Sequence, residues 1–96
     1  MEDFVLYNEL YDIYSGLLTD KQREYFEDYY FNNLSFSEMA DNYGVSRNAI
    51  FKQVHIVLDK LKEYESILQL KSKKEKILKL IDDYDLDIKE KIEDLL

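Results

Sequence analysis

Basic and amide side chains occupy one short stretch near the middle of the chain. Within residues 46–58 the ionisable side chains are Arg47, Lys52 and His55, all of them basic, and Asn48 directly follows Arg47. Arginine and asparagine form paired hydrogen bonds with base edges, whereas lysine suits a phosphate. This combination is typical of a surface that reads nucleic acid, provided that one structural element holds the side chains together.

The sequence around this stretch predicts two helices separated by a short turn. Ser35 and Glu38 have the spacing of a capping box, so a short helix is expected to start there. Ser46 is a good N-cap for the next helix, because its hydroxyl can accept a hydrogen bond from the first turn. Both helix starts lie in SFSEMADNYGVSRNAIFKQVHI, residues 35–56.

Three residues at fixed offsets predict a helix-turn-helix over residues 35–58. Ala40 is small enough for two helices to cross, Gly44 permits the positive φ of a sharp turn, and Ile50 anchors the second helix. A plain corner between two helices is the alternative interpretation of the same pattern.

The outer face of the second helix is the candidate nucleic-acid surface. Ile50, Val54 and Val57 recur at steps of four and three, so they predict the buried side of this helix. The candidate binding residues at its N-cap and on its outer face are Ser46, Arg47, Asn48, Phe51, Lys52 and His55. Residues near the start of such a helix are the ones that reach base edges in the major groove.

The remainder of the chain predicts an all-α fold of five to six helices, forming a single domain over residues 1–96. The chain has no proline and only 2 glycines, whereas strands joined by hairpins need more turn residues. Apolar spacing predicts a helix over residues 2–14, and Thr19 with Gln22 forms a capping box for the next one. The tyrosines recur at helical spacing among aliphatic residues, so they are interpreted as residues at the rim of the core; stacking platforms for nucleic-acid bases are the alternative.

Residues 71–96 predict a helical extension at the C-terminus. The apolar stripe of the second motif helix continues to about Leu70, so its second half needs another packing partner. Ser72 with Glu75 is interpreted as a capping box, and Asp85 as the N-cap of a final helix. The extension can fold back within the chain or pair with a second chain. A homodimer is the preferred hypothesis, because the apolar stripes exceed what a core of this size must cover.

The overall charge opposes binding to nucleic acid. The formal net charge is −8, and residues 17–65 hold nine acidic and six basic side chains. A second basic cluster, which ends at Lys79, follows the motif. Its possible phosphate contacts are Lys71, Lys73, Lys74 and Lys76. Because phosphate binding draws affinity from released counterions, we expect weak, salt-sensitive binding of duplex DNA from so few basic residues.

The sequence predicts no catalytic, cofactor or metal chemistry. His55 is the only histidine, cysteine is absent, and no glycine-rich loop could cradle a phosphate. Four aspartates in residues 83–94 match positions of a calcium loop, but Ile88 replaces the glycine of its sharp turn, which favours a solvated helix face. The sequence also predicts a cytoplasmic protein, because no apolar run nears the ~20 residues of a membrane span and the N-terminus lacks a basic signal region.

One long run resembles a known family. LLTDKQREYFEDYYFNNLSFSEMADNYGVSRNAI, residues 17–50, closely resembles the YlxM family of small bacterial proteins, and residues 58–70, LDKLKEYESILQL, continue the likeness. The resemblance implies a fold similar to region 4 of bacterial sigma factors, with extra C-terminal helices. It also implies a DNA-binding regulator linked to the signal recognition particle, since the family's genes lie beside those of the particle's GTPase and its receptor.

The same resemblance places individual residues. Ser46, Arg47, Asn48 and Lys52 fall on the sigma-like recognition helix, whereas Phe51 stands where sigma factors tend to have arginine. Three functions follow as hypotheses. The first is a regulator that binds DNA through Arg47, Asn48 and Lys52. The second is an adaptor that binds the particle's RNA or its GTPase through Phe51 and the lysine cluster. The third is a domain that docks on another protein only.

Overall fold

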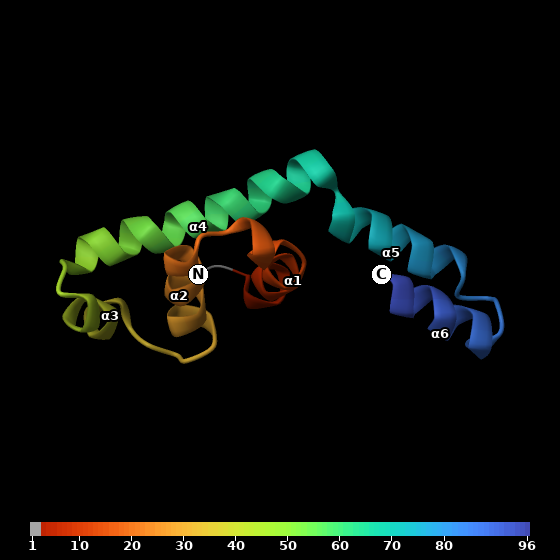
Figure 1. Cartoon of the computed structure of the whole chain (residues 1–96), viewed down its shortest axis with the longest axis horizontal. Helices are drawn as coiled ribbons and strands as arrows, with labels where there is room; N and C mark the ends of the chain where they lie inside the picture. The colour runs from red at the N-terminus through yellow and green to blue at the C-terminus, as the bar shows by residue number, and fades with distance from the viewer. Residues whose placement is uncertain (1–2) are drawn as a thin grey trace.

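The computed structural model describes residues 3–96, and this part of the chain is all-α, without strands (Figure 1). The helices are α1 (Phe4–Tyr14), α2 (Asp20–Tyr30), α3 (Phe36–Tyr43), α4 (Arg47–Leu68), α5 (Leu70–Leu80) and α6 (Leu86–Leu95), with a 3-10 turn, η1 (Ser15–Leu17), after α1. The predicted class and number of helices are confirmed. The predicted first helix also included Glu2, which lies outside the described residues.

Side-chain caps fix where several helices begin. Thr19 with Gln22 and Ser35 with Glu38 form complete capping boxes at the starts of α2 and α3, as the sequence predicts. Asp85 caps α6 by accepting a hydrogen bond from the first turn of that helix. Each of these caps satisfies backbone N–H groups that have no partner within the helix.

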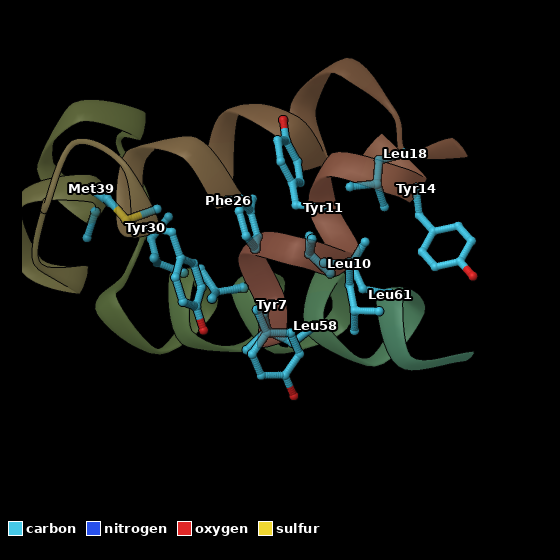
Figure 2. Packing of buried hydrophobic residues seen from close by; sticks show 14 residues of the cluster. Tyr7, Leu10, Tyr11, Tyr14, Leu18, Phe26, Tyr30, Met39, Leu58 and Leu61 are labelled. Carbon is cyan, nitrogen blue, oxygen red and sulfur yellow. The ribbon is translucent and has the colours of Figure 1, made fainter. Parts of the chain in front are cut away.

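One apolar stripe of α4 forms the base of the core (Figure 2). Its five side chains are 0–1% exposed, and α1, α2 and α3 all pack against this helix. Tyr11 of α1 stacks on Phe26 of α2, with ring centroids 4.2 Å apart. The buried core comprises Tyr7, Leu10, Tyr11, Tyr14, Leu18, Phe26, Tyr30, Met39, Ala40, Ile50, Val54, Val57, Leu58 and Leu61. Four of the tyrosines are therefore buried within the core, deeper than the rim position that the sequence predicts.

Three tyrosine hydroxyls tie the core helices together. Each donates a hydrogen bond of 2.6 Å to a carboxylate on a neighbouring helix. The pairs are Tyr11 with Glu27, Tyr14 with Glu65, and Tyr43 with Asp28. Burial, and then the acceptor carboxylate, raises the pKa of each tyrosine above its usual value, so the hydroxyls remain donors.

The break between α4 and α5 lies at a single residue. Gln69 adopts the left-handed conformation with φ 53°, which ends α4 at Leu68. The predicted cap at Ser72 is wrong, because α5 already starts at Leu70 and Ser72 lies in its first turn. Gln69 itself supplies no side-chain cap to α5.

Glu65 of α4 supplies that cap instead. Its carboxylate accepts hydrogen bonds from the backbone N–H groups of Lys71 (3.0 Å) and Ser72 (3.2 Å), besides the one from Tyr14. Burial acts to raise the pKa of Glu65, but these hydrogen bonds and the positive charge of Lys71 outweigh it and lower the pKa below its usual value. The ionised carboxylate therefore stabilises the junction between α4, α5 and α1.

The two C-terminal helices project from one end of the molecule (Figure 1). The described chain measures 53 × 25 × 24 Å, with α3 and the α5–α6 pair at opposite ends of its long axis. On the core side α5 packs against α1, where Lys71 lies 3.1 Å from Glu9. No helix within residues 3–96 is both long enough and apolar enough to span a membrane.

Replacing Glu65 with alanine should lower the free energy of unfolding by about 2 kcal/mol at neutral pH, because a helix loses its cap and a buried hydroxyl loses its acceptor. The folded-state pKa of Glu65 is depressed, so its contribution is complete above the unfolded value of about 4.3 and disappears as the pH falls through the folded value. Urea unfolding followed by circular dichroism, at neutral pH and near pH 3, measures both effects. Glu63→Ala, at an exposed position of the same helix, is the control. Equal losses in both variants at neutral pH would contradict the assignment.

Candidate nucleic-acid interface

The turn between α3 and α4 has the geometry that the sequence predicts. Gly44 ends α3 in the left-handed conformation with φ 68°, and Ser46 caps α4 by accepting the backbone N–H of Ala49 at 3.0 Å. Ala40 lies 6% exposed where the two helices meet, and Ile50 is fully buried beneath them. These two helices and their turn therefore form a helix-turn-helix.

The outer face of α4 carries the predicted binding residues. Arg47, Asn48, Phe51 and Lys52 are exposed, as is the N-cap Ser46. His55 lies further along the helix and is half-buried. Below this face, the apolar stripe of α4 is fully buried, so the side chains above it are held pointing away from the core.

The first turn of α4 adds electrostatic attraction for anions. It contains no acidic residue, and the helix is 22 residues long. The N-terminus of a long helix carries a partial positive charge and presents backbone N–H groups, which together favour a phosphate. Arg47 and Lys52 extend this positive region along the exposed side.

An aromatic row crosses the interface between α3 and α4. Phe51 lies between Phe36, with ring centroids 5.8 Å apart and planes at 88°, and His55, at 4.2 Å. Tyr29 stacks on Phe36 with ring centroids 4.7 Å apart, and the guanidinium of Arg47 lies 5.7 Å from the Phe36 ring. Nδ1 of His55 lies 3.0 Å from the Phe51 carbonyl oxygen, which can only accept a hydrogen bond, so this nitrogen carries the hydrogen.

Phe36 is the member of this site that sequence reasoning missed. Helical spacing assigned it to the apolar side of a short helix, whereas in the structure it is half-buried beside Phe51. The available signal was its position directly after the N-cap Ser35, at the edge of the helix, where a side chain is only partly covered by the core.

The lysine cluster lies on a different surface. Lys73, Lys74, Lys76 and Lys79 are exposed on α5, at the opposite end of α4 from the turn. A helix of 22 residues spans about 33 Å, so α5 does not extend the outer face of the helix-turn-helix. Lys71 is held by Glu75 and Glu9, whose hydrogen bonds raise its pKa, and its charge is thereby compensated.

The acidic C-terminal segment has a helical conformation. Most of the stretch that resembled a calcium loop lies in α6, where a helix replaces the turn that such a loop needs. Within residues 3–96, no three histidine or acidic side chains converge in an arrangement that could hold a metal ion.

This turn, the buried stripe below it and the exposed first turns of α4 define an all-α helix-turn-helix protein. The chain belongs to the UPF0122 family, whose model, described as "Putative helix-turn-helix protein, YlxM / p13 like", matches residues 1–95. This membership confirms the resemblance to the YlxM family found in the sequence.

Relatives from distant bacteria carry the same family name. A UPF0122 protein of Fusobacterium nucleatum is 39% identical over 97 residues, covering 100% of this chain and 94% of the relative. One from Ureaplasma urealyticum serovar 10 is 48% identical over 80 residues, covering 80% of this chain and 81% of its own length. One from Caldanaerobacter subterraneus is 40% identical over 81 residues, covering 84% of this chain and 69% of the relative.

Replacing Gly44 with alanine should lower the free energy of unfolding by about 1 kcal/mol. An added Cβ meets no atom within 4 Å, so the cost is the left-handed backbone conformation alone. Gly16→Ala is the matched control, because its added Cβ also meets nothing and its φ lies outside the left-handed region. Thermal and urea unfolding of both variants measure the difference, and an equal effect at the two glycines would refute the role given to the turn.

Proposed function

We propose that this protein is a DNA-binding regulator that places the N-terminal half of α4 in the major groove, and that it acts in connection with the signal recognition particle. The observation that carries the proposal is the outer face of α4. There Arg47, Asn48 and Lys52 are exposed above a fully buried apolar stripe. The link to the particle rests on membership of the YlxM-like family.

Each residue has a role that follows from its chemistry. Arg47 and Asn48 lie in the first turn, from which side chains reach base edges, and they favour guanine and adenine respectively. Lys52, one turn further along, suits a phosphate, as does the positive end of the helix. The Ser46 hydroxyl accepts the capping hydrogen bond and keeps its own hydrogen to donate to a phosphate oxygen.

The binding is expected to be weak and salt-sensitive. Few cations lie on this face, the lysine cluster of α5 lies at the other end of α4, and the chain carries a formal net charge of −8. Counterion release from two or three phosphate contacts supplies little affinity compared with sites that make many such contacts. The proposed complex therefore depends on low ionic strength, or on a second protein molecule that presents the same face to the DNA.

Titration of a fluorescent duplex at several salt concentrations tests this proposal. The wild-type protein should bind with a negative salt slope, and Lys52→Ala should reduce the size of that slope by about 0.9 because one phosphate contact is lost. Arg47→Ala should weaken binding about tenfold.

Lys91→Ala removes an exposed cation of α6 and should change nothing. Absence of wild-type binding at low salt, or an equal loss in the Lys91 variant, would exclude this mode of DNA recognition.

A second candidate function is an adaptor that binds the RNA or the GTPase of the signal recognition particle. The observation in its favour is the aromatic row, in which Phe51 is 42% exposed between Phe36 and His55. An exposed aromatic ring beside cations suits an unpaired base, and such stacking contributes about 1–3 kcal/mol per base. It also suits a protein contact.

Phe51→Ala separates the two candidates. If the adaptor function holds, this variant should bind the particle's RNA or its purified GTPase at least tenfold more weakly, while its affinity for duplex DNA stays unchanged. Pull-downs with nuclease-treated and untreated material distinguish the RNA from the GTPase. Unchanged binding to both partners would rule the adaptor out.

A further inference from the structure

Phe51 is a large apolar side chain in the middle of an otherwise polar face. It lies four positions after Arg47 and three after Asn48, so these three side chains share one face of α4. Its side chain is 42% exposed, and its neighbours Asn48 and Lys52 are exposed as well. The DNA-binding function proposed above gives roles to these polar neighbours but leaves the ring without one.

Neighbouring rings restrict where the Phe51 ring can point. Phe36 of α3 lies 5.8 Å away with the two ring planes at 88°, and His55, one turn further along α4, lies 4.2 Å away with the planes at 32°. Contacts between aromatic rings at such distances are favourable. A side chain that is already restricted in this way loses little conformational entropy when it binds, so it suits a specific contact.

The chemistry of the ring decides which base it fits. In the major groove all four bases present hydrogen-bond donors or acceptors, but only thymine presents a methyl group. Because a phenyl ring forms no such hydrogen bonds, contact with the polar groups would remove them from water without replacing their partners. Contact with the methyl group instead removes two apolar surfaces from water, which is favourable.

An unpaired base stacked on the ring is the competing occupant. A stacked base needs a large free area of ring face, whereas one methyl group needs much less. The His55 ring, 4.2 Å from Phe51, already takes up part of the space around this ring. The arrangement therefore favours the methyl group.

We propose that Phe51 determines sequence specificity by contacting the 5-methyl group of a thymine in the major groove. The proposal rests on the DNA-binding function given above, and it adds one base to the site that Arg47 and Asn48 read. The thymine lies within that site, because the three side chains share one face of α4.

Selection from a pool of DNA duplexes with a randomised central segment, at low salt, tests the proposal. The wild-type chain should enrich duplexes that carry thymine at one fixed position. Phe51→Ala should lose the preference at that position and keep the preferences at the others.

A single methyl group then isolates the contact. One enriched duplex is synthesised with thymine and again with uracil at the selected position, so that the two probes differ only in the 5-methyl group. Uracil should weaken binding of the wild-type chain about fourfold, the effect expected from burial of one methyl group, and should not affect binding of Phe51→Ala.

Ile56→Ala is the matched control. Ile56 is also 42% exposed on α4, but it lies five positions further along and about 140° around the helix axis from Phe51. This variant should keep both the thymine preference and the effect of uracil. Circular dichroism checks that both variants keep their helices. The exchange of thymine for uracil changes only the DNA, so the wild-type measurement tests the contact whatever a substitution does to folding.

The outcomes separate this proposal from the function on which it rests. If the wild-type chain enriches no duplex, both are overturned. If it enriches duplexes but binds the thymine and uracil probes equally well, the thymine contact alone is overturned and DNA binding stands. A uracil effect that persists in Phe51→Ala would assign the methyl group to another residue. Equal binding of the two probes, together with loss of affinity for the particle's RNA in Phe51→Ala, would assign the ring to an unpaired base.

Discussion

Burial of one stripe of α4 is the interaction on which the rest of the structure depends. Five of its side chains are 0–1% exposed, and three other helices pack on them, bringing aromatic residues such as Tyr11 and Phe26 (Figure 2). Fully burying such a side chain contributes about 1.5–3 kcal/mol, so this stripe is a large part of the folding energy. The same burial fixes the rotation of the helix, and it thereby holds Arg47 and Lys52 in solvent.

The end of α4 is set by polar interactions. Glu65 caps α5 and accepts the hydroxyl of Tyr14, which also accepts the backbone N–H of Leu70 at 3.0 Å. A left-handed residue other than glycine costs about 1–2 kcal/mol, and these charge-assisted hydrogen bonds offset the cost at Gln69. Without them, nothing local in the sequence would stop one helix from continuing through residues 47–80.

The sequence predicts the interactions between residues that are close along the chain, and it misses those between residues that only the fold brings together. The caps at Thr19, Ser35 and Asp85 depend on residues three positions away, so their spacing alone identifies them. The error at Ser72 arose because the true cap, Glu65, lies on the preceding helix and is positioned by a tyrosine 51 residues away.

The candidate site follows the same rule. The apolar periodicity predicts the outer face of α4. It does not predict the aromatic row, because the rings that meet there come from three helices. The distance between this face and the lysines of α5 is likewise known only from the fold.

The net charge of −8 acts on the helix-turn-helix face mainly through the acidic groups that lie near it. At physiological salt, charges on the surface are screened beyond about 8 Å, whereas α4 separates the turn from the two C-terminal helices by about 33 Å. The charges of α5 and α6 act at their own end of the molecule, and those of Arg47, Lys52 and the helix N-terminus act at the other. Glu38 and Asp41 on α3 belong to the helix-turn-helix itself, so they are acidic groups near enough to weaken binding at the turn. The N-terminus of α4 attracts an anion at this same end of the molecule, so it opposes the repulsion from these carboxylates.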